Sequence, residues 1–228
     1  MEARESTGIM SPAQPLFSPL MAKDLITTAS AERRERVRRY FQREAAGYSR
    51  GSGTGLWAWM RRLETPVVME LTDVRPGEAA LDAGSGSGHY TRALAAAGAK
   101  VTALDIEPAM IEALRRELDV EVLVGDLMTV PLEPRFGKIV CAGVLEFVQD
   151  PGAVVTNLAR GLRPDGAMVI LVLARCLPGV GYWLARRANG ISMPMYSRAG
   201  LDALAAGAGL RVLAARRAGY NWVVRLER

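Results

Sequence analysis

The sequence predicts an α/β fold, built as a seven-stranded, mostly parallel sheet with helices on both faces. From about residue 79 onward, short apolar runs alternate with amphipathic helical patterns, which is typical of consecutive βα units. The length of 228 residues suits one large domain with a sizeable core. The longest wholly apolar run, from Ala167 to Ala174, is far shorter than the roughly 18 residues that suggest a membrane span.

The N-terminal part precedes this alternating pattern. Residues 1–30 carry three prolines among Ser, Thr and Gly without apolar periodicity, so we expect a flexible tail. From Ser30, apolar residues recur at helical spacing among many arginines. This predicts a helix whose basic face meets solvent, an anionic membrane surface or RNA. The glycine-rich run 51–55 separates it from a second helix, which begins near Trp57 and ends before Pro76.

The alternating part divides into seven strands and four helices. The segment from Pro108 shows the logic for a helix, because it has proline in its first turn and Ile111 and Leu114 on one apolar face. Residues 163–166, Arg-Pro-Asp-Gly, predict a tight turn. The expected strands cover 79–82, 100–105, 120–124, 139–142, 167–173, 211–215 and 220–226, and the expected helices cover 89–97, 108–118, 151–162 and 198–208.

Composition narrows the chemistry. Cys141 and Cys176 form no CxxC pair and His89 is the single histidine, so we expect neither a disulfide scaffold nor a metal site, and a reducing cytoplasm is the expected location. The formal net charge is +5, but only three of the 29 basic residues are lysine. Together with the many alanines, this bias indicates genomic base composition rather than a nucleic-acid-binding face, so nucleic acid is not the expected partner.

A glycine-rich turn is the strongest chemical signal. Residues 81–88, Leu-Asp-Ala-Gly-Ser-Gly-Ser-Gly, follow a predicted strand and open a predicted helix. Glycines at 84, 86 and 88 allow a tight turn and a close approach of the backbone to a ligand. The dinucleotide fingerprint fails in register, because His89 occupies the third glycine position, and a P-loop lysine is absent. Asp82 precedes the turn and favours a cationic or amino-bearing ligand over a pyrophosphate.

Two further acids follow the next two strands. Asp105 ends the second predicted strand, where a carboxylate can accept hydrogen bonds from both hydroxyls of a ribose, or else cap the helix at Pro108. Gly125, Asp126 and Leu127 follow the third strand. There the carboxylate can accept from an exocyclic amine and the leucine can contact a base, although such a sequence also suits a plain turn.

The order and spacing of these motifs resemble those of class I S-adenosylmethionine (SAM) dependent methyltransferases. The resemblance implies a Rossmann-like seven-stranded sheet with a C-terminal antiparallel strand, and SAM as cofactor. It assigns residues 31–228 to the methyltransferase domain, with a helical cap at 31–75. The cofactor-binding residues that it implies are Asp82, Gly84, Ser85, Gly86, Gly88, Asp105, Ile106, Gly125, Asp126 and Leu127.

Other segments extend the resemblance. Residues 140–148 are similar to the segment after the fourth strand that lies under the cofactor, and residues 37–48 to the cap of enzymes that methylate quinones, porphyrins and other small metabolites. This implies either a position for Tyr48 over the cofactor or a packing role. Many relatives carry a histidine where this chain has Phe147, so Glu146 and His89 remain as the nearest ionisable catalytic candidates. For His89, a role in the cofactor loop or in packing is the alternative.

The methyl acceptor is predicted from the segments outside the sheet. Residues 175–197 form an excursion that is unusually apolar for a surface loop and either covers the substrate or packs on the sheet. Arg186 and Arg187 within it meet solvent, a carboxylate or a membrane surface. The expected substrate residues are Tyr182, Trp183, Met193, Tyr196 and Phe147.

We therefore predict methyl transfer to oxygen or carbon of a small, largely apolar metabolite. There are two alternatives. One is an RNA methyltransferase, and the other is a SAM-binding or protein-binding module without catalysis. The Asn/Asp-Pro-Pro-aromatic box of enzymes that methylate amino groups is absent after the fourth strand, where residues 141–144 read Cys-Ala-Gly-Val. The sequence also leaves peripheral membrane contact and the oligomeric state open.

Overall fold

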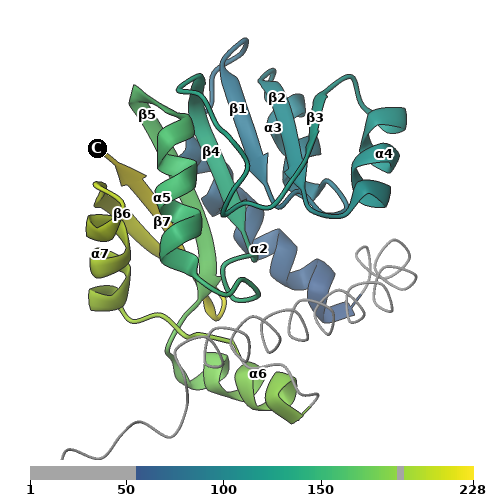
Figure 1. Cartoon of the computed structure of the whole chain (residues 1–228). Coiled ribbons are helices and arrows are strands. Elements are labelled where there is room, and N and C mark those ends of the chain that lie inside the picture. Colours follow the sequence, from purple (N-terminus) through teal and green to yellow (C-terminus); the bar gives the residue numbers. More distant parts are fainter. Residues whose placement is uncertain (1–54, 189–192) are drawn as a thin grey trace, which may run out of the picture.

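A seven-stranded sheet forms the centre of the molecule in the computed structural model, which describes residues 55–188 and 193–228 (Figure 1). The strand order is β3-β2-β1-β4-β5-β7-β6. The strands are β1 (Ala79–Ala83), β2 (Lys100–Asp105), β3 (Glu121–Val124), β4 (Phe136–Ala142), β5 (Leu162–Leu173), β6 (Arg211–Ala218) and β7 (Asn221–Glu227). The helices are α2 (Gly55–Thr72), α3 (His89–Ala96), α4 (Pro108–Glu117), α5 (Pro151–Gly161), α6 (Leu177–Ala188) and α7 (Arg198–Gly207).

The direction of the strands confirms the predicted fold class. Strands β1 to β5 pair in parallel, whereas β7 lies antiparallel between β5 and β6. A short connection joins β6 to β7, as in a two-stranded antiparallel hairpin. Helices α3, α4 and α5 connect β1 to β2, β2 to β3 and β4 to β5, whereas a segment without a helix connects β3 to β4. The sheet is therefore mostly parallel and Rossmann-like, with the predicted antiparallel strand at its C-terminal end.

Helices cover both faces of the sheet, and the central strands are buried accordingly. Along β5, Met168 and Ile170 belong to the core cluster under α5 and α7, whereas the alternating residues Val169 and Leu171 belong to the cluster under α2 and α3. Successive side chains of a strand point to opposite faces, so a strand covered on both faces must be apolar throughout. Figure 1 shows α5 and α7 on the near face.

Two predictions about local structure were wrong. Residues 163–166 form no separate turn but lie within β5, where the pairing with β4 shifts between Phe136 and Lys138 and absorbs the extra residues. The segment 175–197 is not a loop throughout, because residues 177–188 form α6. Composition shows that this segment is apolar, but only the helical spacing of its apolar residues indicates a helix. The other elements expected within the described ranges are present, with boundaries that differ by a few residues.

Some predictions lie outside the described residues. These are the flexible tail at 1–30, the arginine-rich helix from Ser30, and the position of Tyr48. Within the described ranges, no helix combines the length and the apolarity needed to cross a membrane.

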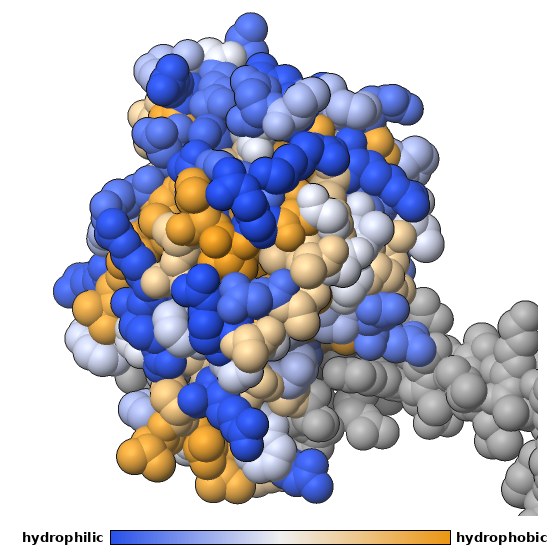
Figure 2. Space-filling view, turned by 90° about the vertical axis from the view of Figure 1, so that its left-hand side faces the viewer, coloured by the Kyte–Doolittle hydropathy of each residue, from blue (hydrophilic) through white to orange (hydrophobic). Residues whose placement is uncertain are grey.

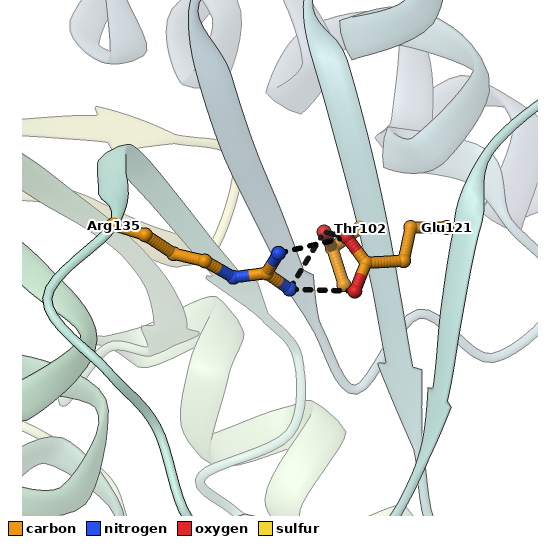
Figure 3. A network of polar contacts seen from close by, with 3 residues as sticks. All are labelled: Thr102, Glu121 and Arg135. Atoms are coloured by element: carbon orange, nitrogen blue, oxygen red, sulfur yellow. Dashed lines mark hydrogen bonds and ion pairs between the residues drawn. The ribbon is translucent and has the colours of Figure 1, made fainter.

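A polar cluster fixes the ends of the strands that lie away from the glycine-rich turn (Figure 3). Arg135 donates two hydrogen bonds to the Glu121 carboxylate, at 2.7 and 2.9 Å, and Thr102 donates a third at 2.9 Å. The bidentate geometry matches the planar guanidinium to the carboxylate. The cluster joins the beginning of β3 to β2 and to the chain just before β4. The candidate functional site lies at the opposite edge of the sheet, where the strands have their carboxyl-terminal ends.

Candidate functional site

Three loops meet at the carboxyl-terminal ends of β1, β2 and β3. The backbone N–H groups of Gly84 and Ser85 donate to the Leu104 carbonyl, at 2.7 and 3.0 Å, which joins the glycine-rich turn to the end of β2. The Gly125 N–H donates to the Asp105 carbonyl at 2.9 Å and joins the third loop to the second. The three motifs that the sequence predicted to act together are therefore neighbours.

Asp105 lies at the centre of this arrangement. Its Oδ2 accepts from the Gly86 N–H at 2.8 Å, and its Oδ1 accepts from the Glu107 N–H at 3.0 Å. The side chain is half-buried. A carboxylate offers about four acceptor positions, so these two bonds hold it in place and leave capacity for hydroxyl donors. The Glu107 N–H lies before α4, whose N-cap residue is Glu107 and has no side-chain cap bond, so Asp105 holds the loop after β2 and does not cap the helix.

The glycines of the turn differ in what they require. Gly84 and Gly88 have φ of +78° and +81°, and a Cβ on either would overlap a neighbour, the Val144 or the Leu114 side chain. Both are therefore required by the packing of the protein itself. Gly86 has φ of +50°, and a Cβ there would meet no atom within 4 Å. Only at Gly86 does the turn present its backbone to open space.

Two buried polar side chains of this segment, Ser85 and Asp82, differ in their hydrogen bonding. The Ser85 hydroxyl is buried and has no hydrogen-bond partner among the described residues, so it is available to bond a ligand group. Asp82 is 2% exposed and accepts from the Thr91 hydroxyl at 2.6 Å. Burial raises the pKa of Asp82 to about 6, against the opposing effect of the Thr91 hydrogen bond. Asp82 thus ties the end of β1 to the first turn of α3.

The residues after β2 and β3 divide between surface and core. Ile106 is 61% exposed beside Asp105. Asp126 is half-buried, and its Oδ1 accepts from the Met128 N–H at 2.9 Å. Leu127 is 6% exposed and belongs to the main core, which leaves little of its surface for a base. Ile106 and Asp126 therefore offer the accessible groups next to Asp105.

Glu146 is the buried carboxyl closest to the end of β5. It is 5% exposed, and its Oε1 accepts from the Leu173 N–H at 2.6 Å, while Oε2 has no partner among the described residues. Burial raises the pKa of Glu146 to about 7, and the charge of Glu64 adds to the increase. The Tyr196 hydroxyl is also buried and has no partner among the described residues; burial raises the pKa of Tyr196, and the charge of Glu146 adds to the increase. Tyr196 donates its N–H to the Leu173 carbonyl at 2.9 Å, so Leu173 anchors both residues.

His89 has a packing contact that explains its position. Its Nε2 lies 2.7 Å from the Thr65 hydroxyl of α2, and its ring meets the Tyr90 ring edge-on. Partial burial lowers the pKa of His89 to about 4, with further lowering by Arg61 and Arg92. The imidazole is therefore neutral near pH 7 and joins α2 to α3.

Sequence reasoning missed a buried polar pair near the same end of β5. Asn221 donates to Glu64 Oε1 at 2.7 Å, and Asn221 pairs with Leu173 in the sheet. Desolvation raises the pKa of Glu64. The two partners are 157 positions apart, and neither carries a motif. No pattern in the sequence would have connected them.

An apolar cluster adjoins Glu146. Leu173 and Met193 are its buried members, and the Trp183 Nε1–H donates to the Met193 carbonyl at 3.0 Å. Tyr182 stacks on Tyr220 with ring centroids 4.9 Å apart. The partly buried residues packed against Leu173 and Met193 are Phe147, Tyr182, Trp183, Met195 and Tyr220. Four of the five predicted substrate residues thus lie together, whereas Tyr196 packs against the main core.

Residues 55–188 and 193–228 hold no group of three His, Cys, Asp or Glu side chains placed to bind a metal ion. The site consists instead of a glycine-rich turn, carboxylates after three successive parallel strands, and an adjacent apolar cluster. On a seven-stranded sheet of this order, such a set is typical of SAM-dependent methyltransferases.

Comparison with known proteins agrees with this class. Residues 81–170 match the family model described as a methyltransferase domain. A malonyl-[acyl-carrier protein] O-methyltransferase of Serratia marcescens is 33% identical over 137 residues, which cover 58% of this chain and 53% of that protein. A ubiquinone biosynthesis O-methyltransferase of Alkalilimnicola ehrlichii is 34% identical over 106 residues, which cover 43% of each chain. The chain thus spans about half the length of these curated relatives.

Solved structures share the fold. An O-methyltransferase from neocarzinostatin biosynthesis, in complex with SAM and 2-hydroxy-5-methyl naphthoic acid, is 27% identical with a TM-score of 0.56 and covers 65% of this chain and 48% of that one. A magnesium protoporphyrin IX methyltransferase of Synechocystis has a TM-score of 0.65 at 19% identity, with 86% and 99% of the two chains covered. At that identity the second likeness concerns the fold alone.

Proposed function

We propose that this domain transfers a methyl group from SAM to oxygen or carbon of a small, largely apolar metabolite. The observation that carries the proposal is the junction of the three loops, in which the Gly86 N–H holds the Asp105 carboxylate beside the exposed backbone of the turn. This arrangement combines a close-approach position for a ligand with an acceptor for hydroxyl donors. SAM is an amino acid joined to a nucleoside, so its binding needs both the close approach to the backbone and the acceptor for hydroxyl groups.

The described residues fit SAM in chemical type. Gly86 leaves space for the cofactor, and the unpartnered Ser85 hydroxyl supplies a hydrogen bond to it. We assign the ribose to Asp105, and the adenine to Asp126 with Ile106 as its apolar neighbour. The turn that carries these groups keeps its shape through Gly84 and Gly88. Asp82 holds α3 against β1 through its hydrogen bond with Thr91.

The acceptor site follows from the apolar cluster around Leu173. Its aromatic and methionine side chains suit a flat or greasy ligand, and the cluster lies at the carboxyl-terminal end of β5, beside the segment after β4 that carries Glu146. Val144 in this segment contacts Gly84 of the glycine-rich turn, so the cofactor and acceptor regions adjoin. The naphthoic acid bound by the 27% identical neighbour is an acceptor-sized aromatic compound and supports the same class of ligand.

Glu146 is the base that this geometry favours for an acceptor hydroxyl. When bound, SAM would supply an electrophilic methyl group on its sulfonium sulfur. Glu146 Oε2 would accept the proton of the acceptor hydroxyl as the acceptor oxygen takes up that methyl group. A carboxyl whose pKa is near 7 can accept this proton at neutral pH, whereas His89 is held by Thr65. Positioning of the two reactants beside the apolar cluster around Leu173 provides the rest of the catalysis.

Binding and transfer experiments test the proposal separately. Isothermal titration with SAM should show binding to the full chain, and Asp105→Asn should weaken it by roughly 1–3 kcal/mol through loss of charge-assisted hydrogen bonds. Asp119→Asn, an exposed acid on the connection after α4, is the matched control and should bind normally. Equal affinity of both folded variants would limit Asp105 to joining the two loops through the Gly86 and Glu107 N–H groups.

A labelled-methyl assay on a fractionated cell extract then identifies the acceptor class. We expect label in small organic molecules, reduced in Trp183→Ala. Label confined to RNA would favour the RNA methyltransferase alternative. SAM binding without transfer to any fraction would favour a non-catalytic module.

A further inference from the structure

Helix α6 carries an apolar face that the protein leaves exposed. Leu177 is 90% exposed and Leu184 is 55% exposed. Residues 177, 181, 184 and 188 follow one another at helical spacing, so they share one face, and they are Leu, Gly, Leu and Ala, all exposed. The opposite side of the helix holds Tyr182 and Trp183, which contact the cluster around Leu173. The helix is therefore anchored on one side and apolar on the other.

The position of α6 adds to this exposure. Figure 1 shows the helix at the lower end of the molecule, away from the sheet. Figure 2 shows apolar side chains gathered at this lower end, with strongly hydrophilic ones beside them. A contiguous apolar surface bordered by polar residues marks an interaction site more often than an isolated exposed leucine does.

The charged residues of α6 and of the segments next to it in the sequence are all basic. Residues 166–201 contain four arginines and neither Asp nor Glu. Arg198 forms an ion pair with Asp202, while Arg175 and Arg187 are exposed at the two ends of α6. Arg186 and Arg187 stack over Tyr182 and Trp183, at 5.0 and 5.3 Å from the ring centroids, so both guanidinium groups lie against the aromatic rings of the anchored side. The charged residues of this segment are all arginines, and an apolar stripe beside arginines is complementary to an apolar surface of negative charge.

We propose that α6 is a docking helix for an anionic lipid bilayer, with Leu177 and Leu184 at the acyl boundary and Arg175 and Arg187 at the lipid phosphates. Amphipathic helices that lie in the plane of a membrane interface combine these two features. A second copy of the chain fits less well. A stable dimer buries about 800 Å² per partner, whereas the exposed stripe is one face of a 12-residue helix. A dimer through arginine-flanked faces would also bring like charges together.

Vesicle binding by the full chain tests the proposal. Wild-type protein should co-sediment with vesicles that contain phosphatidylglycerol and remain in solution with pure phosphatidylcholine. Leu177→Asp should weaken binding by about tenfold or more, since it places a charge where an apolar group enters the interface. Arg175→Gln should weaken it by about fivefold, the effect of one basic residue near an anionic surface. Added salt should also release the protein.

Matched controls separate docking from general surface effects. Leu213→Asp changes an equally apolar side chain, 48% exposed on β6, and Arg115→Gln removes an exposed charge on α4; both should bind vesicles as the wild type does. Because Leu177 is almost fully exposed, Leu177→Asp should keep the wild-type melting temperature, and Leu177→Gln provides a milder second variant. SAM titration of each variant reports on the proposed function independently of lipid.

Three results would overturn the docking role. One is equal binding to neutral and anionic vesicles, or none to either. Another is unchanged vesicle binding in both Leu177 variants. The third is a dimer in lipid-free solution that Leu177→Asp dissociates, since the exposed face would then join two copies of the chain.

Discussion

Two alanine substitutions in the glycine-rich turn separate folding from cofactor binding. Gly84 and Gly86 both have positive φ, +78° and +50°, but their surroundings differ. A Cβ on Gly84 would overlap the Val144 side chain, whereas a Cβ on Gly86 would point into open space. Gly84→Ala should therefore damage the fold, and Gly86→Ala should damage ligand binding.

The expected stability changes follow from these surroundings. A non-glycine residue in the left-handed region costs about 1–2 kcal/mol, and loss of glycine's freedom in the unfolded chain offsets about 0.4–1 kcal/mol. Gly86→Ala should thus lower the free energy of unfolding by about 1 kcal/mol. Overpacking against Val144 adds about 1–3 kcal/mol, so Gly84→Ala should lower it by roughly 2–4 kcal/mol.

Urea denaturation and SAM titration measure the two effects on the same samples. Gly86→Ala should remain folded at 25 °C and bind SAM at least about tenfold more weakly, because its methyl group occupies the space of the ligand. Wild-type SAM affinity in folded Gly86→Ala would refute the assignment of that space to the cofactor. Equal stability of the two variants would refute the packing argument at Val144.

Two further predictions concern buried and exposed charges. Burial raises the pKa of Glu146 from 4.5 to about 7, so the folded protein holds a proton that the unfolded chain releases, and stability falls as pH rises through this window. Glu146→Gln keeps an acceptor for the Leu173 N–H, and methyl transfer should be lost. Its free energy of unfolding, relative to that of the wild type, should rise by up to about 3 kcal/mol between pH 5 and 8. A difference in urea denaturation that does not depend on pH would contradict the burial argument. Arg135→Ala should cost less than about 1 kcal/mol, since the side chains of Arg135 and Glu121 are 46% and 49% exposed, and salt should reduce the difference. A loss above about 2 kcal/mol would show that the Thr102 cluster is stronger than its exposure indicates.

The glycine-rich turn and the acids after it were predictable because each is a local signal. Asp105 ends a strand and precedes a proline-initiated helix, and both features follow from adjacent residues. Parallel strands place their carboxyl ends at one edge of a sheet, so three acids that follow three successive strands must lie near one another. The contacts from Gly86 and Gly125 to Asp105 are the result.

Other features had no local signal. The exposure of Leu177 depends on α6 turning its tyrosine and tryptophan toward Leu173, and the composition of residues 175–197 indicated apolarity without a direction. Leu127 was expected at a base and lies in the core, since its position after β3 allows either side. In both cases one-dimensional patterning gave the type of residue, but packing decided which way it faces.

The sequence by itself determined the alternation of strands and helices, the turn that requires glycine, and the order of the acids, because these depend on spacing of a few residues. Only the tertiary structure decided which distant groups meet. Insertion of β7 beside β5 brings Asn221 to Leu173 and to Glu64 across 157 positions, and the end of β5 supplies the backbone N–H that holds Glu146. Such contacts depend on strand order and on the burial of polar groups that must then find partners, and no short-range pattern encodes them.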